Sequence, residues 1–198
     1  MKYLLILLPL MVSSCALAPF APETSGRSAG HGTLFASVGN TNNAYHLKFA
    51  MGLSKDVDLG FIMEFGDVST STLFFKYSFL NNKTGPALAG EFGYGSTETT
   101  KIYYLGIIGS LAFSEEFELF TNIRVNNVST DVTDIEKNKF HGNIQITDYD
   151  LVYLQATVGF NVWFGKSTGL SLYSTYYKGE KIITKEDGVF GASLLFKF

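Results

Sequence analysis

The residues of this chain that could carry acid–base or nucleophilic chemistry are few and far apart. Histidine occurs only as His31, His46 and His141, and Cys15 is the single cysteine. Nucleophilic catalysis needs a hydroxyl or thiol beside an activating base, and no spacing places such a pair together; His141, for example, has no serine two positions away. Phosphate-binding loops, metal-ligand clusters and nucleic-acid motifs are also missing. We therefore expect no catalytic residue, no metal and no cofactor.

An acidic segment near the middle of the chain is a candidate for binding. Residues 128–149 and the position after them hold five carboxylates: Asp131, Asp134, Glu136, Asp148 and Asp150. Carboxylates can ligate calcium, but their spacing matches no calcium loop, and a solvated loop is the simpler interpretation. Long loops on a rigid scaffold are where recognition usually occurs. The segment 128–149 is therefore the place where a possible surface ligand would be expected to bind.

The chemistry of Cys15 depends on the segment before it. Lys2 is followed by an apolar stretch from Tyr3 to Val12, which is typical of a secretory signal peptide. With one cysteine, no internal disulfide can form. The stretch ends in Val12-Ser-Ser-Cys15, which resembles the bacterial lipoprotein signal, in which the cysteine is acylated and becomes the first mature residue. The alternative is an ordinary signal peptide with a chance cysteine.

The lipoprotein resemblance implies a division of the chain. Residues 1–14 would be the signal peptide, Cys15 would carry palmitate-type acyl chains, and the lipoprotein-processing machinery would be a partner. Ala16, in place of an aspartate, implies export to the outer membrane. Residues 16–32 are rich in Pro, Gly, Ser and Ala without periodicity, which predicts a flexible tether. The lipidated N-terminus and tether would then cover 15–32, and one domain would cover 33–198.

The composition of the chain limits the class of that domain. Only 17% of the 198 residues are charged, whereas about a quarter are charged in an average soluble domain. Past residue 12, no apolar run reaches the about 20 residues that a membrane-spanning helix needs. The apolar residues are therefore dispersed, as in alternating strands. The net charge of −3 and the lack of basic runs argue against nucleic acid as a partner.

From residue 33 onward, apolar and polar residues alternate with the period of two that indicates β-strands. In Val152–Phe164, for example, one face is entirely apolar and the other is mostly polar. Ten such runs occur, near 33–39, 44–53, 57–66, 71–80, 86–96, 101–113, 117–127, 150–164, 168–178 and 188–198. Most have the roughly 9 to 11 residues of a tilted transmembrane strand.

The connections between the runs also sort into two sets. Links after even-numbered runs are tight, whereas links after odd-numbered runs include the longest, 128–149 and 179–187. Short turns at one end and longer loops at the other are typical of an outer-membrane barrel. The predicted fold is therefore an all-β, antiparallel, up-and-down transmembrane barrel of ten strands. The alternative is eight strands, because the first run is short.

Two segments resemble outer-membrane barrels more specifically. The end of the chain, Phe190-Gly-Ala-Ser-Leu-Leu-Phe-Lys-Phe198, is similar to the terminal strand of that family, whose last phenylalanine is recognised by the assembly machinery. The hairpin Gly52–Gly60 resembles the periplasmic hairpins of small OmpA-like barrels. The resemblance implies outer-membrane lipids and the barrel assembly machinery as partners. It also implies a bacterial outer-membrane location, with Phe198 and the lipidated N-terminus on the periplasmic side.

The strand faces opposite the apolar ones would point into the lumen, and they carry charge. The set is His46, Lys48, Asp58, Glu64, Lys76, Glu91, Glu118, Arg124 and Lys197. In a soluble β-sandwich these groups would enter the core at high cost. Counting from the turns places Lys76 opposite Glu91, and Gly106 between Glu91 and Arg124. It places Lys48 opposite or diagonal to Glu64. We therefore expect a structural ladder, Lys48–Glu64–Lys76–Glu91–Arg124, in a packed interior.

Three functions are compatible with this architecture. The first is a nonenzymatic outer-membrane lipoprotein with a structural or surface-interaction role through its outer loops. The second is an enzyme similar to the barrels that acylate or deacylate lipid A, which would use His46 or His141. The third is a narrow channel. Fold alone does not choose among them.

Overall fold

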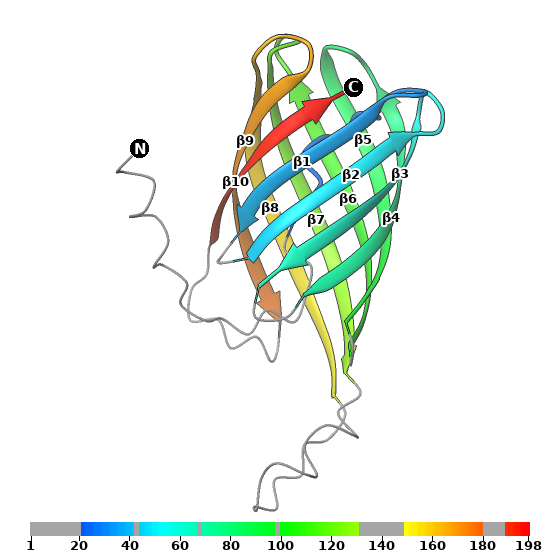
Figure 1. Ribbon diagram of the computed structural model, residues 1–198, viewed down its shortest axis with the longest axis vertical. Helices are drawn as coiled ribbons and strands as arrows, with labels where there is room; N and C mark the ends of the chain where they lie inside the picture. The colour runs from blue at the N-terminus through cyan, green and yellow to red at the C-terminus, as the bar shows by residue number, and fades with distance from the viewer. Residues whose placement is uncertain (1–20, 42–43, 67–68, 98–99, 131–148, 180–188) are drawn as a thin grey trace, which may run out of the picture.

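The chain closes into a single β-barrel, as the computed structural model shows for residues 21–41, 44–66, 69–97, 100–130, 149–179 and 189–198. Every strand pairs antiparallel with its neighbours in sequence, and β1 also pairs with β10, which closes the sheet (Figure 1). The strands are β1 Leu34–Thr41, β2 Ala44–Gly52, β3 Val57–Phe65, β4 Thr70–Asn81, β5 Gly85–Ser96, β6 Thr100–Ala112, β7 Phe117–Thr130, β8 Tyr149–Trp163, β9 Thr168–Gly179 and β10 Val189–Lys197.

The predicted fold class is confirmed, and each predicted run corresponds to one strand with ends shifted by up to three residues. The eight-strand alternative is wrong because the short first run forms a full strand. β1 pairs with β2 from Leu34↔Met51 to Thr41↔Ala44 and with β10 from Phe35↔Lys197 to Thr41↔Gly191. A barrel in hydrocarbon needs this closure, since an open strand edge there could not be solvated.

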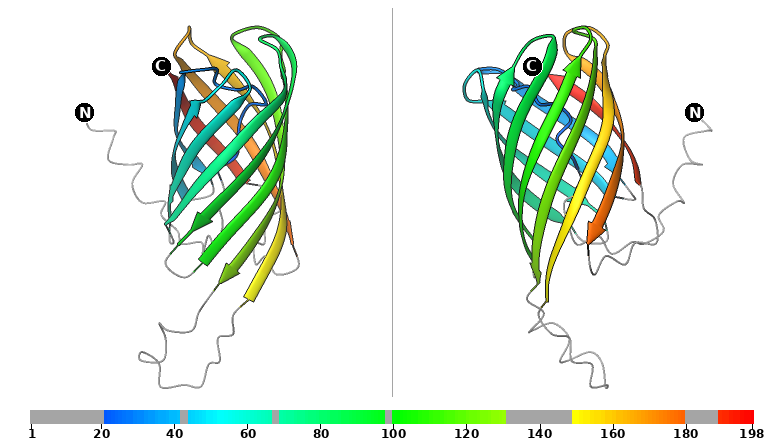
Figure 2. Two further views of the ribbon diagram at one scale, coloured as in Figure 1. Left: turned by 90° about the vertical axis from the view of Figure 1, so that its right-hand side faces the viewer. Right: turned by 180° about the vertical axis from the view of Figure 1, so that it is seen from behind.

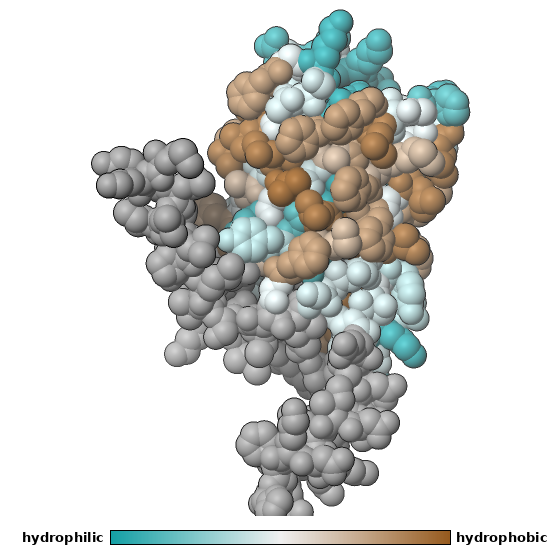
Figure 3. Space-filling model, in the orientation of Figure 1, coloured by the Kyte–Doolittle hydropathy of each residue, from teal (hydrophilic) through white to brown (hydrophobic). Residues whose placement is uncertain are grey.

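Alternation along each strand separates an apolar exterior from a polar interior. In β4, Leu73 and Phe75 are exposed while Thr72 and Lys76 are buried. A belt of apolar residues crosses the face of the barrel seen in Figure 3, and hydrophilic residues lie at the upper end of that face. This is the reverse of a soluble core and is the distribution of a barrel solvated by lipid.

The two ends of the barrel differ in their connections. At the end that carries the C-terminus, upper in Figure 1, the turns are residues 53–56, 82–84, 113–116 and 164–167. Gly85 and Gly165, at two of these turns, have φ of 85° and 84°, which glycine adopts without steric cost. We call this the short-turn end. The opposite end, where β7 and β9 end and β8 and β10 begin, is called the loop end.

Among the described residues, no helix is long and apolar enough to cross a membrane.

The segment before β1 lies inside the barrel. Residues 21–32, dark blue in Figure 2, lie between the short-turn end and the interior of the barrel instead of running away from it. Ala21, Glu23 and Thr24 are 5% exposed or less. The prediction of a flexible tether is therefore wrong for 21–32, because this segment bonds with strand residues remote in sequence. We call residues 21–29 the plug. Residues 15–20 of the predicted tether lie outside the described part of the chain.

Candidate functional site in the barrel lumen

The lumen holds a concentration of charged side chains that the alternation of the strands directs inward. Eight of the nine residues expected there are buried, none more than 6% exposed: His46, Lys48, Asp58, Glu64, Lys76, Glu91, Glu118 and Arg124. The ninth, Lys197, is exposed near the end of β10. Buried charge is tolerated only where it is paired and hydrogen-bonded. The ion pairs and hydrogen bonds of these side chains therefore decide whether they stabilise the barrel or are available for binding and catalysis.

Glu91 and Arg124 form the central ion pair. Arg124 donates from Nε to Glu91 Oε1 and from Nη2 to Oε2, both at 3.2 Å, and Asn122 Nδ2 donates to Oε1 at 2.8 Å. The guanidinium also lies 3.9 Å from the centre of the Tyr104 ring, a cation–π contact. Glu91 pairs in register with Gly106, and Gly106 with Arg124, as the sequence predicts. The absent side chain of Gly106 leaves room for the contact.

Replacing Gly106 by valine is expected to destabilise the barrel by about 1–3 kcal/mol, the usual range for overpacking. A Cβ atom at Gly106 would lie 2.6 Å from Glu91 Oε1, so the ion pair would have to move. Chemical denaturation of the detergent-folded protein, followed by Trp163 fluorescence, would measure the change. Gly109→Val in the same strand is the control, because its Cβ meets only Thr121 Cγ2 at 3.5 Å. Equal loss in both variants would contradict the proposed role of Gly106.

Lys48 and Lys76 form ion pairs with a carboxylate that the predicted ladder of lumen charges did not include. Glu23 of the plug lies between them, with Oε1 at 2.8 Å from Lys48 Nζ and Oε2 at 3.6 Å from Lys76 Nζ. Lys76 also pairs with Asp58 at 2.9 Å. One carboxylate thus joins β2 to β4 across β3, and the plug takes part in the charge balance of the barrel wall.

The continuous ladder is therefore corrected in its first half. Lys76 and Glu91 are register partners, as predicted, but the ion pairs of Lys76 are made with Glu23 and Asp58. Lys48 pairs in register with Ile62, so Glu64 is only its diagonal neighbour. Glu64 instead accepts hydrogen bonds from the Ala21 main-chain N–H (2.6 Å) and from Thr70 Oγ1 (3.0 Å). The physical reason is the plug, which competes for these groups.

At the short-turn end, further contacts hold the plug. Arg27 forms an ion pair with Glu118 and donates to the Gly85 carbonyl at 2.6 Å. Ser28 Oγ and the Ala29 N–H donate to Asp58 Oδ1 at 2.6 and 3.0 Å. The main-chain carbonyls of the plug are also bonded, since Lys76 Nζ donates to Arg27 O at 2.7 Å. Backbone polar groups inside a barrel need such partners.

The charge state of Glu23 follows from this arrangement. Burial alone would raise the pKa of its carboxyl, but the ammonium groups of Lys48 and Lys76 outweigh burial and hold the pKa below its usual range. Glu23 is therefore ionised at neutral pH, and it neutralises two cations that the strands supply.

His46 meets a serine that no sequence spacing could have indicated. Its Nε2 lies 3.1 Å from Ser193 Oγ, across Gly39, where a Cβ would lie 2.3 Å from that oxygen. Tyr173 and Thr41 extend this cluster, with their hydroxyls 2.6 Å apart. Among the residues that the structure describes, none bonds to His46 Nδ1, so none of them orients the imidazole as a catalytic base would require. His46 and Ser193 are each 4% exposed.

The other predicted residues are placed as follows. Phe198 closes the barrel seam, because its N–H donates to Leu34 O at 2.8 Å and its carbonyl accepts from the Leu34 N–H at 3.1 Å. His31 Nδ1 lies 2.9 Å from Leu53 O at the short-turn end. Cys15, His141 and most of 128–149 lie outside the described residues. Within the described residues, no group of three or more His, Cys, Asp or Glu is placed to hold a metal.

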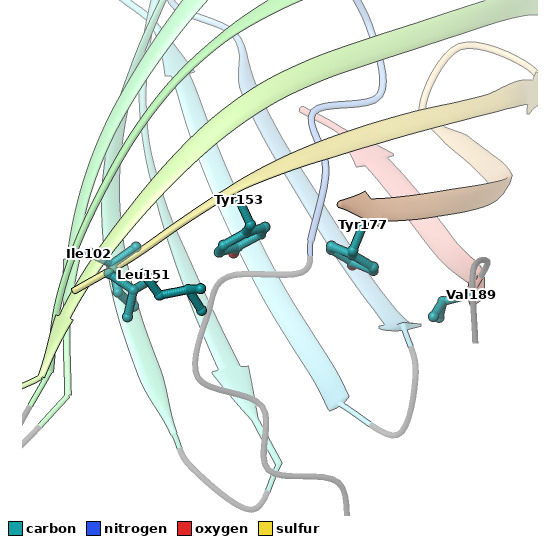
Figure 4. Packing of buried hydrophobic residues seen from close by; sticks show 6 residues of the cluster. Ile102, Leu151, Tyr153, Tyr177 and Val189 are labelled. Carbon is teal, nitrogen blue, oxygen red and sulfur yellow. The ribbon is translucent and has the colours of Figure 1, made fainter. Parts of the chain in front are cut away.

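The lumen also contains buried apolar side chains toward the loop end. Ile102, Val128, Leu151 and Val189 form a buried cluster there with two tyrosines, and Figure 4 shows Tyr153 and Tyr177 pointing into the interior. The two rings lie 6.2 Å apart. Large side chains therefore occupy space in the part of the lumen beyond the plug.

Comparison with known proteins gives likeness of fold only. No family model matches the chain, and no curated protein matches it. Among solved structures, the KdgM porin is 8% identical with a TM-score of 0.47, covering 84% of this chain and 99% of that one. The N-terminal β-barrel domain of Pseudomonas aeruginosa OprF (12%, 0.37) covers 85% and 99%, and Neisserial surface protein A (14%, 0.38) covers 89% and 100%. The outer membrane enzyme PagL is also similar (12%, 0.36; 84% and 98%).

The topology, the apolar exterior and the polar interior decide the fold. The chain has the fold of an outer-membrane β-barrel. Sequence reasoning missed the plug residues, above all Glu23 and Arg27. Periodicity cannot detect a segment that has no regular structure, and the inward set was already nearly balanced in charge. The available signal was the small size of most residues in 21–29, which suits a narrow lumen.

Proposed function

We propose that this protein is a nonenzymatic barrel of the bacterial outer membrane whose lumen is closed by its own N-terminal segment. Its role would be structural or would consist of surface interaction through the loop end, including 128–149. In this proposal Cys15 carries the lipid. Outer-membrane lipids, the lipoprotein-processing machinery and the barrel assembly machinery would be its partners.

The single observation that carries the proposal is the occupation of the lumen by the plug. Glu23 by itself contacts both sides of the interior. Its carboxylate pairs with Lys48 and Lys76, and its main-chain carbonyl accepts a hydrogen bond from Asn122 Nδ2 at 3.4 Å. A barrel of about this size leaves little more space than its own side chains need. A chain held in that space by ion pairs opposes the passage of solutes.

Conductance in planar lipid bilayers tests the closed lumen. The wild-type protein is expected to give no discrete steps, whereas deletion of 21–29 is expected to give them. The deletion variant must first show the gel shift between unheated and boiled samples that reports a folded barrel. If it does not fold, the double variant Glu23→Gln/Arg27→Ala replaces it. Steps from the wild type would contradict the proposal and favour the narrow channel.

A second candidate function is favoured by the contact between His46 and Ser193. A histidine at 3.1 Å from a serine hydroxyl is the arrangement that could activate a nucleophile for acyl transfer. The burial of both residues and the unpartnered Nδ1 argue for a structural hydrogen bond. Activity of the wild type toward lipid A that His46→Ala abolishes would replace the first proposal by this one.

A further inference from the structure

The plug has a direction that can be followed along one strand. Ala29 bonds to Asp58, the second residue of β3 from the short-turn end, whereas Ala21 bonds to Glu64, the second-last residue of the same strand. The chain therefore moves away from the short-turn end as its residue numbers decrease. Contacts with β7 keep this order, since Ser25 Oγ donates to Glu118, Glu23 O accepts from Asn122 and Ala21 O accepts from Arg124, successively farther from the short-turn end.

The depth of Ala21 follows from strand geometry. Asp58 and Glu64 are six residues apart, which is about 20 Å along a strand and about 15 Å along the axis of a barrel tilted by about 40°. Ala21 O also accepts from Arg124 Nη1 at 3.3 Å, in the middle of β7. Ala21 thus lies deep in the lumen, and one residue of β3 separates Glu64 from the loop end of that strand.

The lumen admits one pass of chain beside the strands. Glu23 reaches β2 and β4 with its carboxylate and β7 with its carbonyl, and Thr24 O accepts from Asn161 Nδ2 of β8 at 2.6 Å. These contacts lie on opposite walls, and Ala21, Glu23 and Thr24 are nearly fully buried. A second segment returning beside the plug would have to displace them.

Covalent geometry limits the reach of Cys15. It lies six positions before Ala21, so its Cα lies within about 22 Å of the Ala21 Cα even in a fully extended chain. To reach the leaflet at the short-turn end, the chain would have to return about 15 Å through the occupied lumen and then pass around the barrel rim. The loop end lies in the direction in which the chain already runs from Ala29 to Ala21.

We propose that the N-terminal segment is threaded through the barrel, entering at the loop end and leaving at the short-turn end before β1. A lipid on Cys15 then inserts in the outer, cell-surface leaflet, whereas the sequence alone favours the periplasmic one. The inference rests on the proposed outer-membrane location, in which the short-turn end is periplasmic. The acyl chains and the barrel would hold the protein from opposite ends of its plug.

Labelling of one added cysteine in intact cells with a membrane-impermeant maleimide tests the threading; each variant keeps Cys15, and the wild type reports any labelling of Cys15 itself. Three variants of the full chain are compared with the wild type: Ala18→Cys upstream of the plug, Asn138→Cys in 131–148, and Lys166→Cys in the turn 164–167. Ala18→Cys is expected to label in intact cells as Asn138→Cys does. Lys166→Cys is expected to label only after the outer membrane is permeabilised.

The outcomes distinguish a failure of the threading proposal from a failure of the proposed outer-membrane location. If Asn138→Cys labels in intact cells but Ala18→Cys requires permeabilisation, the threading is wrong and the barrel location stands. If Lys166→Cys labels in intact cells and Asn138→Cys does not, the orientation is reversed and both ideas fail. If Ala18→Cys labels under neither condition, an epitope inserted after Ala16 and detected by antibody gives the decision. Antibody binding to intact cells supports threading, and binding only after permeabilisation overturns it.

Discussion

Replacing Glu91 by lysine is expected to lower the free energy of unfolding by about 3–5 kcal/mol, the cost of leaving a buried charge without its partner. Glu91 holds Arg124 through two hydrogen bonds of 3.2 Å and accepts a third from Asn122. A lysine there would place a second cation against a guanidinium that is 1% exposed. The Glu23 carboxylate is engaged with Lys48 and Lys76, so it is not free to compensate.

The measurement for Glu91→Lys is the denaturant midpoint of the protein refolded in detergent or lipid, followed by Trp163 fluorescence and by the gel shift between unheated and boiled samples. Glu116→Lys is the matched control, since it makes the same charge change at an exposed turn position. Glu91→Gln keeps the shape and removes only the charge, so an intermediate loss is expected from it. If Glu91→Lys unfolds at the wild-type midpoint, the ion pair does not stabilise the barrel.

Replacing Glu23 by glutamine is expected to release the plug while the strands stay paired. The substitution leaves Lys48, which is 2% exposed, without its ion-pair partner, whereas Lys76 retains Asp58. The cost to plug binding should approach the about 3–5 kcal/mol typical of a broken buried pair. That energy equals a population shift of more than a hundredfold toward the released plug, at 1.4 kcal/mol per factor of ten.

Trypsin reports this release, because Arg27 is held in the barrel by Glu118 and by the Gly85 carbonyl. In the detergent-folded protein, cleavage after Arg27 should be slow for the wild type and at least tenfold faster for Glu23→Gln. Glu115→Gln, at an exposed turn, is the matched control and should behave like the wild type. Equal cleavage of all three proteins would mean that Glu23 does not hold the plug.

The pH dependence of the same contact has a defined sign. The folded-state pKa of Glu23 lies below its ordinary value of 4.5 because Lys48 and Lys76 outweigh the effect of burial. Its contribution to stability is therefore complete above pH 4.5 and is lost as the pH falls through the lower folded value. The difference between wild type and Glu23→Gln should persist at neutral pH and shrink only in acid.

The position of the plug bears on how the predicted N-terminal lipid relates to the barrel. An N-terminal lipid and a closed barrel would be redundant as anchors if both acted from the periplasmic side. In the proposed threading they are not redundant, because the plug runs from Ala29 toward Ala21 and a lipid on Cys15 would insert at the loop end. The plug also makes the N-terminal segment part of the folded barrel, so that loss of Glu23 affects both stability and closure.

The sequence alone determines where the strands lie and the registers around Glu91, whereas closure of the sheet decides that the strands are ten and not eight. An alternating pattern such as Val152–Phe164 has a period that only an extended chain produces, and short turns fix which residues face each other. For that reason the register of Lys76 with Glu91, and the contact of Glu91 with Arg124 across Gly106, were predictable. Local periodicity and turn length carry this information within neighbouring strands.

The tertiary structure alone decided the path of the plug and the partners that it takes. Glu23 is 25 residues from Lys48 and 53 from Lys76, and irregular chain has no period that reveals what it contacts. Likewise, His46 and Ser193 are 147 residues apart and meet only because β1 joins β2 to β10 and carries Gly39 between them. Barrel closure brings such groups together, and closure is a property of the whole sheet that no single segment encodes.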